Sequence, residues 1–172
     1  MKTIFWNVDT QYDFMRADGK LYVQGAESIE GNLEKLTKLA EARNIQVVNT
    51  ADWHNEKTKE ISNTPDFVNT FPRHCMHGTP GAEYIPATRP KDAYKISWSD
   101  KDFDGNKVKS SRNIILYKDK FDVFTGTPHA EAVLTAIKPY RAMVYGVATN
   151  VCVDHAVMGL LGRKREVYII MD

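Results

Sequence analysis

Short apolar runs alternate with segments of helical periodicity along this chain, and this alternation limits the possible folds more than any other feature. Five apolar runs are predicted strands, at residues 3–8, 45–50, 114–117, 142–145 and 166–171. Three predicted helices lie between them, at residues 29–43, 127–137 and 152–162. Strands that alternate with helices form right-handed crossovers and a parallel sheet covered on both faces. The predicted fold class is therefore α/β, a three-layer αβα (Rossmann-like) fold with an open, mainly parallel sheet of five or six strands.

Two of the predicted helices begin with recognisable start signals. Ser28 is a suitable N-cap for the first helix, and Pro128 stands where a first helical position is expected. The segment 55–113 has no clear periodicity, but its prolines and aromatic residues favour an ordered region with a functional role. Within it, the charged residues 101–109 are expected to form a hairpin or loop tip.

Polar residues follow several of the predicted strands. In an open parallel sheet, ligands bind in the crevice beyond the carboxyl ends of the strands. Side chains suited to catalysis or metal binding lie just past these ends, at Asp9, Asp52, His54, Lys118 and Cys152. We therefore expect these residues to face one crevice.

Cys152 stands where a strand, a tight turn and a helix are predicted to meet. The positive end of a helix dipole and unpaired N–H groups at that point would favour the thiolate over the thiol. A nucleophilic thiol also needs a base and a nearby cation, and Asp9 and Lys118 are residues of these types. The alternative at this stage is that Cys152 is a small buried hydrophobic residue, as most free cysteines are.

Composition narrows the classes of partner. The formal net charge is +1 and the lysines are scattered, so neither nucleic acid nor an anionic membrane is an expected partner. Two cysteines, Cys75 and Cys152, do not form a disulfide framework. Met1 and Lys2 lead into a short strand rather than a signal peptide, and no run reaches transmembrane length. The expected location is the cytoplasm.

Six motifs in this order resemble those of the isochorismatase-like cysteine hydrolases, and within that superfamily the chain is most similar to the nicotinamidases. The motifs lie at residues 9–14, 52–54, 71–75, 78–82, 118–124 and 146–153. The resemblance spans the whole chain. The Asp-x-His pair at 52–54 together with His74-Cys75 is its most specific part, because it is similar to the metal site of nicotinamidases.

The resemblance implies a catalytic triad of Asp9, Lys118 and Cys152. Asp9 is expected to take the thiol proton and later to protonate the departing ammonia, while Lys118 holds and polarises the carboxylate–thiol pair. It also implies a non-proline cis peptide between Val147 and Ala148, with the N–H groups of Ala148 and Cys152 forming the oxyanion hole. The implied reaction converts nicotinamide to nicotinic acid and ammonia through a cysteine thioester, as in NAD salvage.

The resemblance further implies one divalent metal ion, held by Asp52, His54 and His74. Zinc suits these oxygen and imidazole donors best, with iron or manganese as alternatives. Many nicotinamidases carry another histidine shortly after the Asp-x-His motif, whereas residues 55–58 contain none. Three protein ligands with added water are still sufficient for a site that leaves a position open to substrate.

Several other residues have two possible interpretations from the sequence. The expected substrate contacts around a flat ring are Phe14, Phe71 and Val147. His77 and Cys75 are extra candidate ligands, although a loop residue and a packed thiol are the simpler interpretations. The same applies to residues that could serve structure or the site, namely Gln11, Asp13, Lys120, His129 and His155.

Two alternatives to a nicotinamidase stay open at this stage. One is a related hydrolase that acts on another small amide or a ureide, and the other is a member that binds a small molecule without catalysis. Residues 1–172 are expected to form a single domain, with 55–113 as an insertion that carries part of the active site and metal site. The domain is expected to lack the last helix and strand of the family, which would leave the final strand uncovered. Either the chain is truncated, the remainder lies outside residues 1–172, or a partner copy in a homo-oligomer covers the strand.

Overall fold

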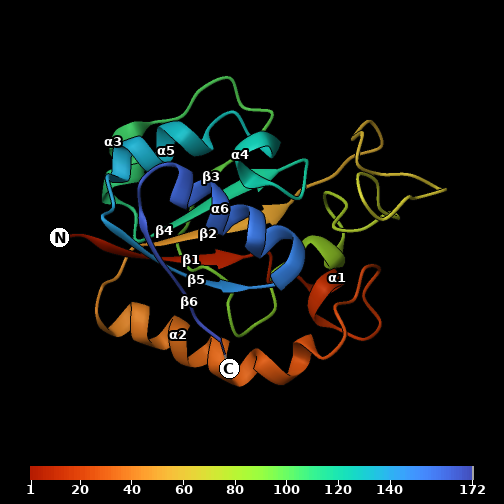
Figure 1. The fold of residues 1–172 in the computed structure, drawn as a ribbon, viewed down its shortest axis with the longest axis horizontal. Helices are drawn as coiled ribbons and strands as arrows, with labels where there is room; N and C mark the ends of the chain where they lie inside the picture. Colours follow the sequence, from red (N-terminus) through yellow and green to blue (C-terminus); the bar gives the residue numbers. More distant parts are fainter. Residues whose placement is uncertain (172) are drawn as a thin grey trace.

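A six-stranded sheet lies at the centre of the computed structural model, which describes residues 1–171 (Figure 1). Within these residues the strands are β1 (Thr3–Val8), β2 (Val47–Asp52), β3 (Tyr94–Ile96), β4 (Asn113–Lys118), β5 (Arg141–Gly146) and β6 (Glu166–Ile169). Their order is β3-β4-β2-β1-β5-β6, and every neighbouring pair is parallel. The prediction of an open, parallel α/β sheet is therefore confirmed.

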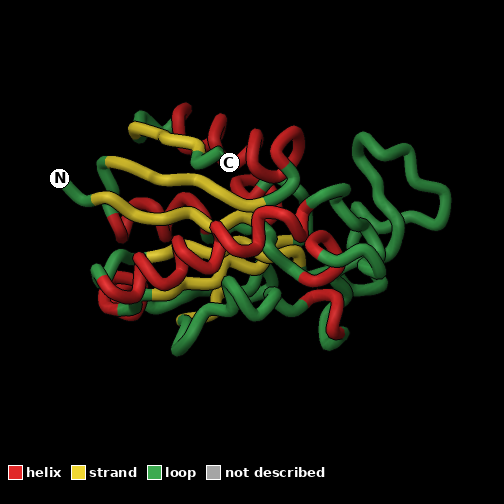
Figure 2. Tube along the Cα trace, turned by 90° about the horizontal axis from the view of Figure 1, so that it is seen from below, coloured by secondary structure: helices red, strands yellow, loops and turns green. Residues whose placement is uncertain are grey.

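Helices cover both faces of this sheet. They are α1 (Tyr12–Met15), α2 (Glu30–Ala42), α3 (Gly105–Ser110), α4 (Val123–Gly126), α5 (Ala130–Ile137) and α6 (Asp154–Gly162). Helix α2 packs on one face, whereas α3 to α6 lie on the other (Figures 1 and 2). Three layers result, as predicted.

The pleat of β1 shows how the sequence builds the two cores. Ile4, Trp6 and Val8 belong to the apolar cluster beneath α5 and α6, while Phe5 belongs to the cluster beneath α2. Successive side chains of a strand point to opposite faces, so a strand buried on both sides is apolar at nearly every position.

The ends of several elements differ from the prediction. Strand β2 runs over Val47–Asp52 rather than 45–50, and β6 ends at Ile169. Helix α5 begins at Ala130, so Pro128 precedes it. Ser28 does not cap α2, because its hydroxyl donates to the Gly25 carbonyl and a 3₁₀ turn at 26–29 leads into the helix.

The segment 55–113 is ordered and contains elements that its sequence did not reveal. Strand β3, helix α3 and a 3₁₀ turn at Pro80–Ala82 all lie in it. Residues 101–109 overlap α3 rather than forming a hairpin, because the Asp104 carboxylate accepts the N–H groups of Asn106 and Lys107 as an N-cap. An arm at residues 61–71 extends beyond the carboxyl edge of the sheet (Figures 1 and 2).

No helix among residues 1–171 has the length and apolar character that crossing a membrane requires.

Candidate active site and metal centre

Four of the predicted site residues come from the carboxyl ends of adjacent strands. Asp9 follows β1, while Asp52 and Lys118 end β2 and β4 and are paired in register across the sheet. Cys152 follows β5 and lies in a π-helical turn over Thr149–Val153, not at the first position of α6. All four are buried. The strand order β4-β2-β1-β5 makes these ends neighbours, which brings the four side chains together as predicted.

Lys118 is the electrostatic centre of this group. Its ammonium lies 2.9 Å from Oδ2 of Asp9, contacts Oδ1 of Asp52, and donates to the Lys120 carbonyl at 3.1 Å. Burial lowers the pKa of Lys118, but the two carboxylates outweigh that effect and raise it well above its ordinary value. Lys118 is therefore charged and fully engaged.

The two carboxylates differ in proton affinity. Burial raises the pKa of the Asp9 carboxyl, and Lys118 only partly offsets that effect. Burial acts on Asp52 in the same direction, but Lys118, His54 and His74 together hold its pKa well below the ordinary value. Asp9 is therefore the better proton acceptor of the two, while Asp52 stays ionised. The Thr50 hydroxyl donates to Oδ1 of Asp9 at 2.6 Å and fixes its orientation.

The thiol of Cys152 differs from the expectation of a stabilised thiolate. Burial raises its pKa well above the ordinary value, and the nearby carboxylates of Asp9 and Asp52 add to that effect against Lys118. The sulfur and carboxylate oxygens of Cys152, Asp9 and Asp52 lie within 4.8 Å of one another. In this environment a charged sulfur beside two acids is unfavourable, so the resting form is the thiol.

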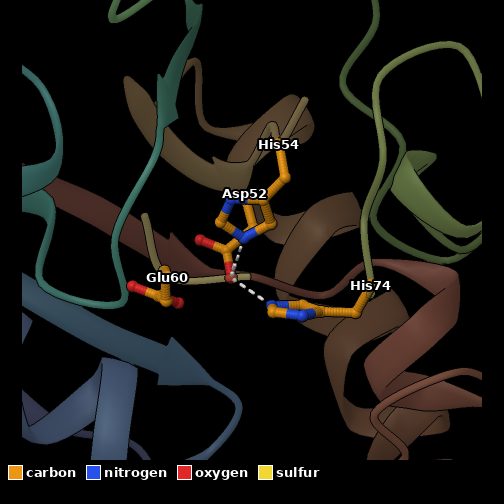
Figure 3. Close-up of side chains that lie close together, drawn as sticks. All are labelled: Asp52, His54, Glu60 and His74. Atoms are coloured by element: carbon orange, nitrogen blue, oxygen red, sulfur yellow. Dashed lines mark hydrogen bonds and ion pairs between the residues drawn. The ribbon is translucent and has the colours of Figure 1, made fainter. Parts of the chain in front are cut away.

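Asp52, His54 and His74 meet as predicted, and Glu60 joins them to make a group of four possible metal ligands (Figure 3). One ligand atom from each lies within 4.8 Å of the others. Nε2 of His74 is 3.4 Å and Nε2 of His54 is 3.7 Å from Oδ2 of Asp52.

Both histidines have a ring nitrogen that is available to bind a metal ion. Nδ1 of His74 lies 2.7 Å from the Pro72 carbonyl, which can only accept, so Nδ1 carries a proton and Nε2 is free to ligate. Both ring nitrogens of His54 are buried without a hydrogen-bond partner. Such orphaned polar atoms are costly in a protein interior, and a metal ion on one of them would remove part of that cost. The residues present therefore fit a divalent metal.

Glu60 is a member of this group that the sequence did not reveal. It lies six positions past His54, in a segment without periodicity and just beyond residues 55–58, which contain no histidine. Burial raises its pKa to about 7, with a further contribution from the charge of Asp52. Its Oε2 accepts the Phe121 N–H at 2.7 Å, which fixes the side chain. A carboxylate shortly past the Asp-x-His motif is a signal for it in the sequence, but the exposed Glu56 satisfies the same signal, so the sequence does not single out Glu60.

A mainly apolar cavity of about 170 Å³ opens beside these groups. Cys152, Asp52, Glu60 and His74 line it together with Ala148. Its apolar walls come from Phe14, Leu21, Tyr22, Val23, Phe71, Phe121 and Val151. Phe14 and Phe71 were expected there, whereas residues 21–23 and Phe121 were not.

Val147 and Ala148, at the turn before Cys152, lie in different surroundings. The peptide between Val147 and Ala148 is cis, as expected. Ala148 lines the cavity, but Val147 is not among the lining residues and is buried in the core cluster with Phe5 and Tyr145.

The residues that could serve either the structure or the site mostly make structural contacts. Gln11 donates to the Asp52 and Ala82 carbonyls and accepts the Asp52 N–H, so it holds the end of β2 through its backbone. His77 packs on Trp53 at 4.8 Å and is not in the group of possible ligands, and Cys75 is buried with a pKa raised by that burial. Three of the remaining four are not among the possible ligands either: His129 contacts the Asp100 carbonyl, His155 packs on Phe121, and Lys120 is exposed.

A parallel sheet with a buried cysteine, carboxylate and lysine at its carboxyl edge defines an α/β protein with a cysteine-centred site. The family model of the isochorismatase domain matches residues 3–172. The chain therefore belongs to the isochorismatase family, and the resemblance recognised in the sequence is confirmed.

The relatives of known activity include nicotinamidases. Nicotinamidase/pyrazinamidase of Mycobacterium tuberculosis (strain ATCC 25618 / H37Rv) is 38% identical over 81 residues, which cover 46% of this chain and 42% of that protein. The aligned part thus spans less than half of the relative.

Solved structures confirm the fold over nearly the whole chain. Nicotinamidase from Bacillus subtilis superposes with a TM-score of 0.75 at 22% identity, over 98% of this chain and 83% of that one. Pyrazinamidase of Pyrococcus horikoshii in complex with zinc gives 0.74 at 24% identity, over 98% and 83%. N-carbamoylsarcosine amidase from Thermoplasma acidophilum gives 0.73 at 23%, over 99% and 82%.

Proposed function

We propose that this protein is a metal-dependent amidohydrolase that converts nicotinamide to nicotinic acid and ammonia. The observation that carries the proposal is the position of Lys118 between Asp9 and Asp52, with Cys152 in the same buried group and four possible metal ligands beside it. The family membership and the nicotinamidase relative support the same activity.

Asp9 is the proton carrier in this mechanism. Its raised pKa suits a carboxylate that takes the thiol proton of Cys152 as the sulfur attacks the carboxamide carbon. The C–N bond of the tetrahedral intermediate then breaks, and Asp9 returns the proton to the departing ammonia. A water deprotonated by Asp9 attacks the resulting thioester, the C–S bond breaks to give nicotinic acid, and Asp9 returns its proton to the departing sulfur of Cys152. Because the resting thiol is protonated, proton transfer accompanies the attack.

Two other parts of the site stabilise the negative charge that forms during the reaction. Lys118 stays positive throughout, pairs with the Asp9 carboxylate and stabilises the negative charge that develops on the sulfur. The backbone N–H groups of Ala148 and Cys152 are the proposed donors to the oxyanion, and both residues line the cavity. One such donor is typically worth about 3 kcal/mol in the transition state.

Asp52, His54, Glu60 and His74 are the residues that would hold the metal ion, most suitably zinc, with iron or manganese as alternatives. When bound, a divalent ion would supply Lewis-acid chemistry beside the cavity. The pyrazinamidase of known structure was crystallised in complex with zinc, which favours that metal here.

The cavity favours a neutral, flat amide over a carboxylate-bearing ureide. Phe14, Phe71 and Phe121 are suited to contact an aromatic ring. Among the described residues that line the cavity, no arginine or lysine is available to pair with a substrate carboxylate. Lys118 does not serve that purpose, because Asp9 and Asp52 already neutralise it.

Ammonia release from nicotinamide tests the proposal. The purified chain should release ammonia and nicotinic acid in equal amounts, and Cys152→Ala should abolish both. Cys75→Ala is the matched control, because the Cys75 thiol does not line the cavity and the substitution keeps the backbone N–H and carbonyl that contact Asp13 and His54, so turnover should remain. Turnover retained in Cys152→Ala, or no turnover in the metal-loaded wild type, would falsify the assignment.

A further inference from the structure

Asp13 is a buried carboxylate that lies outside the catalytic group. It is 5% exposed and belongs to the short helix α1. Its Oδ2 accepts the N–H of Cys75 at 2.7 Å, and its Oδ1 accepts the N–H of Lys20 at 3.0 Å. Each carboxylate oxygen therefore holds the backbone of a different segment.

Cys75 connects Asp13 to both candidate histidine ligands. It follows His74 directly, and its carbonyl accepts the His54 N–H at 3.1 Å. Cys75 has a φ of 43°, in the left-handed region that residues other than glycine rarely adopt. A residue held in that conformation needs support from its surroundings, and its N–H bond to Asp13 provides it. Displacing the Asp13 carboxylate would therefore affect the backbone that carries both imidazoles.

The space around Asp13 is filled closely. A Cβ placed on Gly81 would lie 2.2 Å from Oδ2 of Asp13, so the absence of a side chain at residue 81 allows the carboxylate to reach Cys75. The backbone carbonyl of Asp13 also accepts the Leu21 N–H at 3.1 Å, at the start of the cavity wall formed by residues 21–23. Asp13 thus links the wall of the cavity, through its backbone carbonyl, to the segment that bears His74, through its carboxylate.

We propose that Asp13 is a positioning residue that sets the geometry of His54 and His74 as metal ligands, an inference that rests on the proposed function. It acts through the backbone of Cys75 and does not touch substrate or metal. Groups that orient metal ligands typically contribute tenfold to hundredfold to metal affinity. Loss of the Asp13 carboxylate should therefore weaken metal binding by about that factor while the sheet stays folded.

Binding of Co²⁺ to the full chain tests this inference, because its visible absorption reports ligand geometry independently of activity. In Asp13→Ala we expect the Co²⁺ dissociation constant to rise about tenfold to hundredfold, with a changed absorption spectrum. Asp13→Asn keeps one acceptor oxygen and should restore part of the affinity. Gly81→Ala displaces the carboxylate without removing it and should weaken binding in the same direction.

Two control variants separate positioning from general damage. Asp18→Asn removes a charge five residues past Asp13, at an exposed residue whose carboxylate accepts from the Tyr12 hydroxyl. Gly31→Ala adds a Cβ where nothing lies within 4 Å. Both should bind Co²⁺ as the wild type does.

The outcomes distinguish this inference from the proposed function. The positioning role of Asp13 is overturned if both Asp13→Ala and Gly81→Ala keep the wild-type Co²⁺ affinity and spectrum. It is also overturned if the wild-type chain binds no Co²⁺. If Asp13→Ala does not fold, Gly81→Ala and Asp13→Asn decide the question alone. A wild type that binds Co²⁺ but leaves nicotinamide intact overturns the proposed function, while the spectra still test Asp13.

Discussion

The ammonium of Lys118 lies 2.9 Å from Oδ2 of Asp9, and both groups are fully buried. Asp9 Oδ2 has no well-aligned hydrogen bond, so this contact is an ion pair held by charge and by the packing around it. A buried ion pair becomes costly when one member is removed, because the other charge is left without compensation.

Replacement of Lys118 should therefore damage both stability and activity. In Lys118→Met, Asp9 and Asp52 face each other without a cation, and we expect the free energy of unfolding to fall by about 3 kcal/mol. Urea unfolding measures the loss, and ammonia release should be abolished. Lys120→Met is the control, because the Lys120 side chain is exposed and only its carbonyl contacts Lys118. Equal losses in the two variants would contradict a special role for Lys118.

The raised pKa of Cys152 predicts slow alkylation at neutral pH in the metal-free protein. The thiolate reacts and the thiol does not, so a raised pKa moves the rise in rate to higher pH. Asp9→Asn removes a negative neighbour, which should lower the pKa of Cys152 and move that rise to lower pH, even though turnover is lost with the base. Iodoacetamide labelling followed by peptide mass spectrometry measures the rate at Cys152 separately from Cys75. A rise at the same or higher pH in Asp9→Asn would contradict the electrostatic account.

Metal binding should weaken as the pH falls. The pKa of Glu60 is about 7, and Asp52 raises that of His74 against the effect of burial, so both groups gain protons on acidification. A metal must displace those protons, so affinity should drop as the pH decreases through about 7. Glu60→Gln should lower metal affinity and reduce this pH dependence, whereas Glu56→Gln, at an exposed residue paired with Arg73, should do neither. Competition with a chelating dye at pH 6 and pH 8 measures both effects.

Removal of the metal should also lower thermal stability. A ligand present at a hundredfold excess over its dissociation constant stabilises the native state by about 2.7 kcal/mol. The melting temperature should therefore fall after treatment with a chelator and recover on addition of Zn²⁺. A variant that lacks both imidazoles, His54→Ala with His74→Ala, should show no such shift, and a shift of wild-type size in it would place the metal elsewhere.

Phe71 and Val147 were both expected as substrate contacts, but the structure distinguishes them. Phe71 lines the cavity, whereas Val147 is 4% exposed and packed in the core. Phe71→Ala should raise KM for nicotinamide because it removes a wall of the cavity. Val147→Ala should lower the free energy of unfolding by about 2 kcal/mol with KM unchanged. Steady-state kinetics and urea unfolding on both variants measure this contrast, and a raised KM in Val147→Ala would reverse the assignment.

Asp9, Asp52, Lys118 and Cys152 show why part of this site was predictable. Each follows or ends an apolar strand, and parallel strands deliver their carboxyl ends to one edge of the sheet. The sequence was less informative about the short elements. Strand β3 and helix α3 lie in a segment whose spacing has no dominant period, and their ends depend on local contacts such as the Asp104 cap.

Glu60, Phe121 and residues 21–23 could not be assigned to the site from the sequence. They lie in irregular segments, where neither period 2 nor period 3.6 reports which way a side chain points. The hydrogen bond between Glu60 and the Phe121 N–H joins residues 61 positions apart, and only the folded chain brings them together. Sequence patterns predict side-chain direction only where the backbone is regular.

Periodicity and strand ends in the sequence were sufficient to predict five of the six strands, three of the helices, the parallel sheet and the residues at its carboxyl edge. The burial of these side chains, and with it the proton affinities of Cys152, Asp9 and Asp52, follows from the packing of the folded chain. The tertiary structure also decided that Glu60 joins the ligands and that Val147 belongs to the core. The physical reason is that burial and the distances between charges arise from the packing of distant segments, which no local pattern contains.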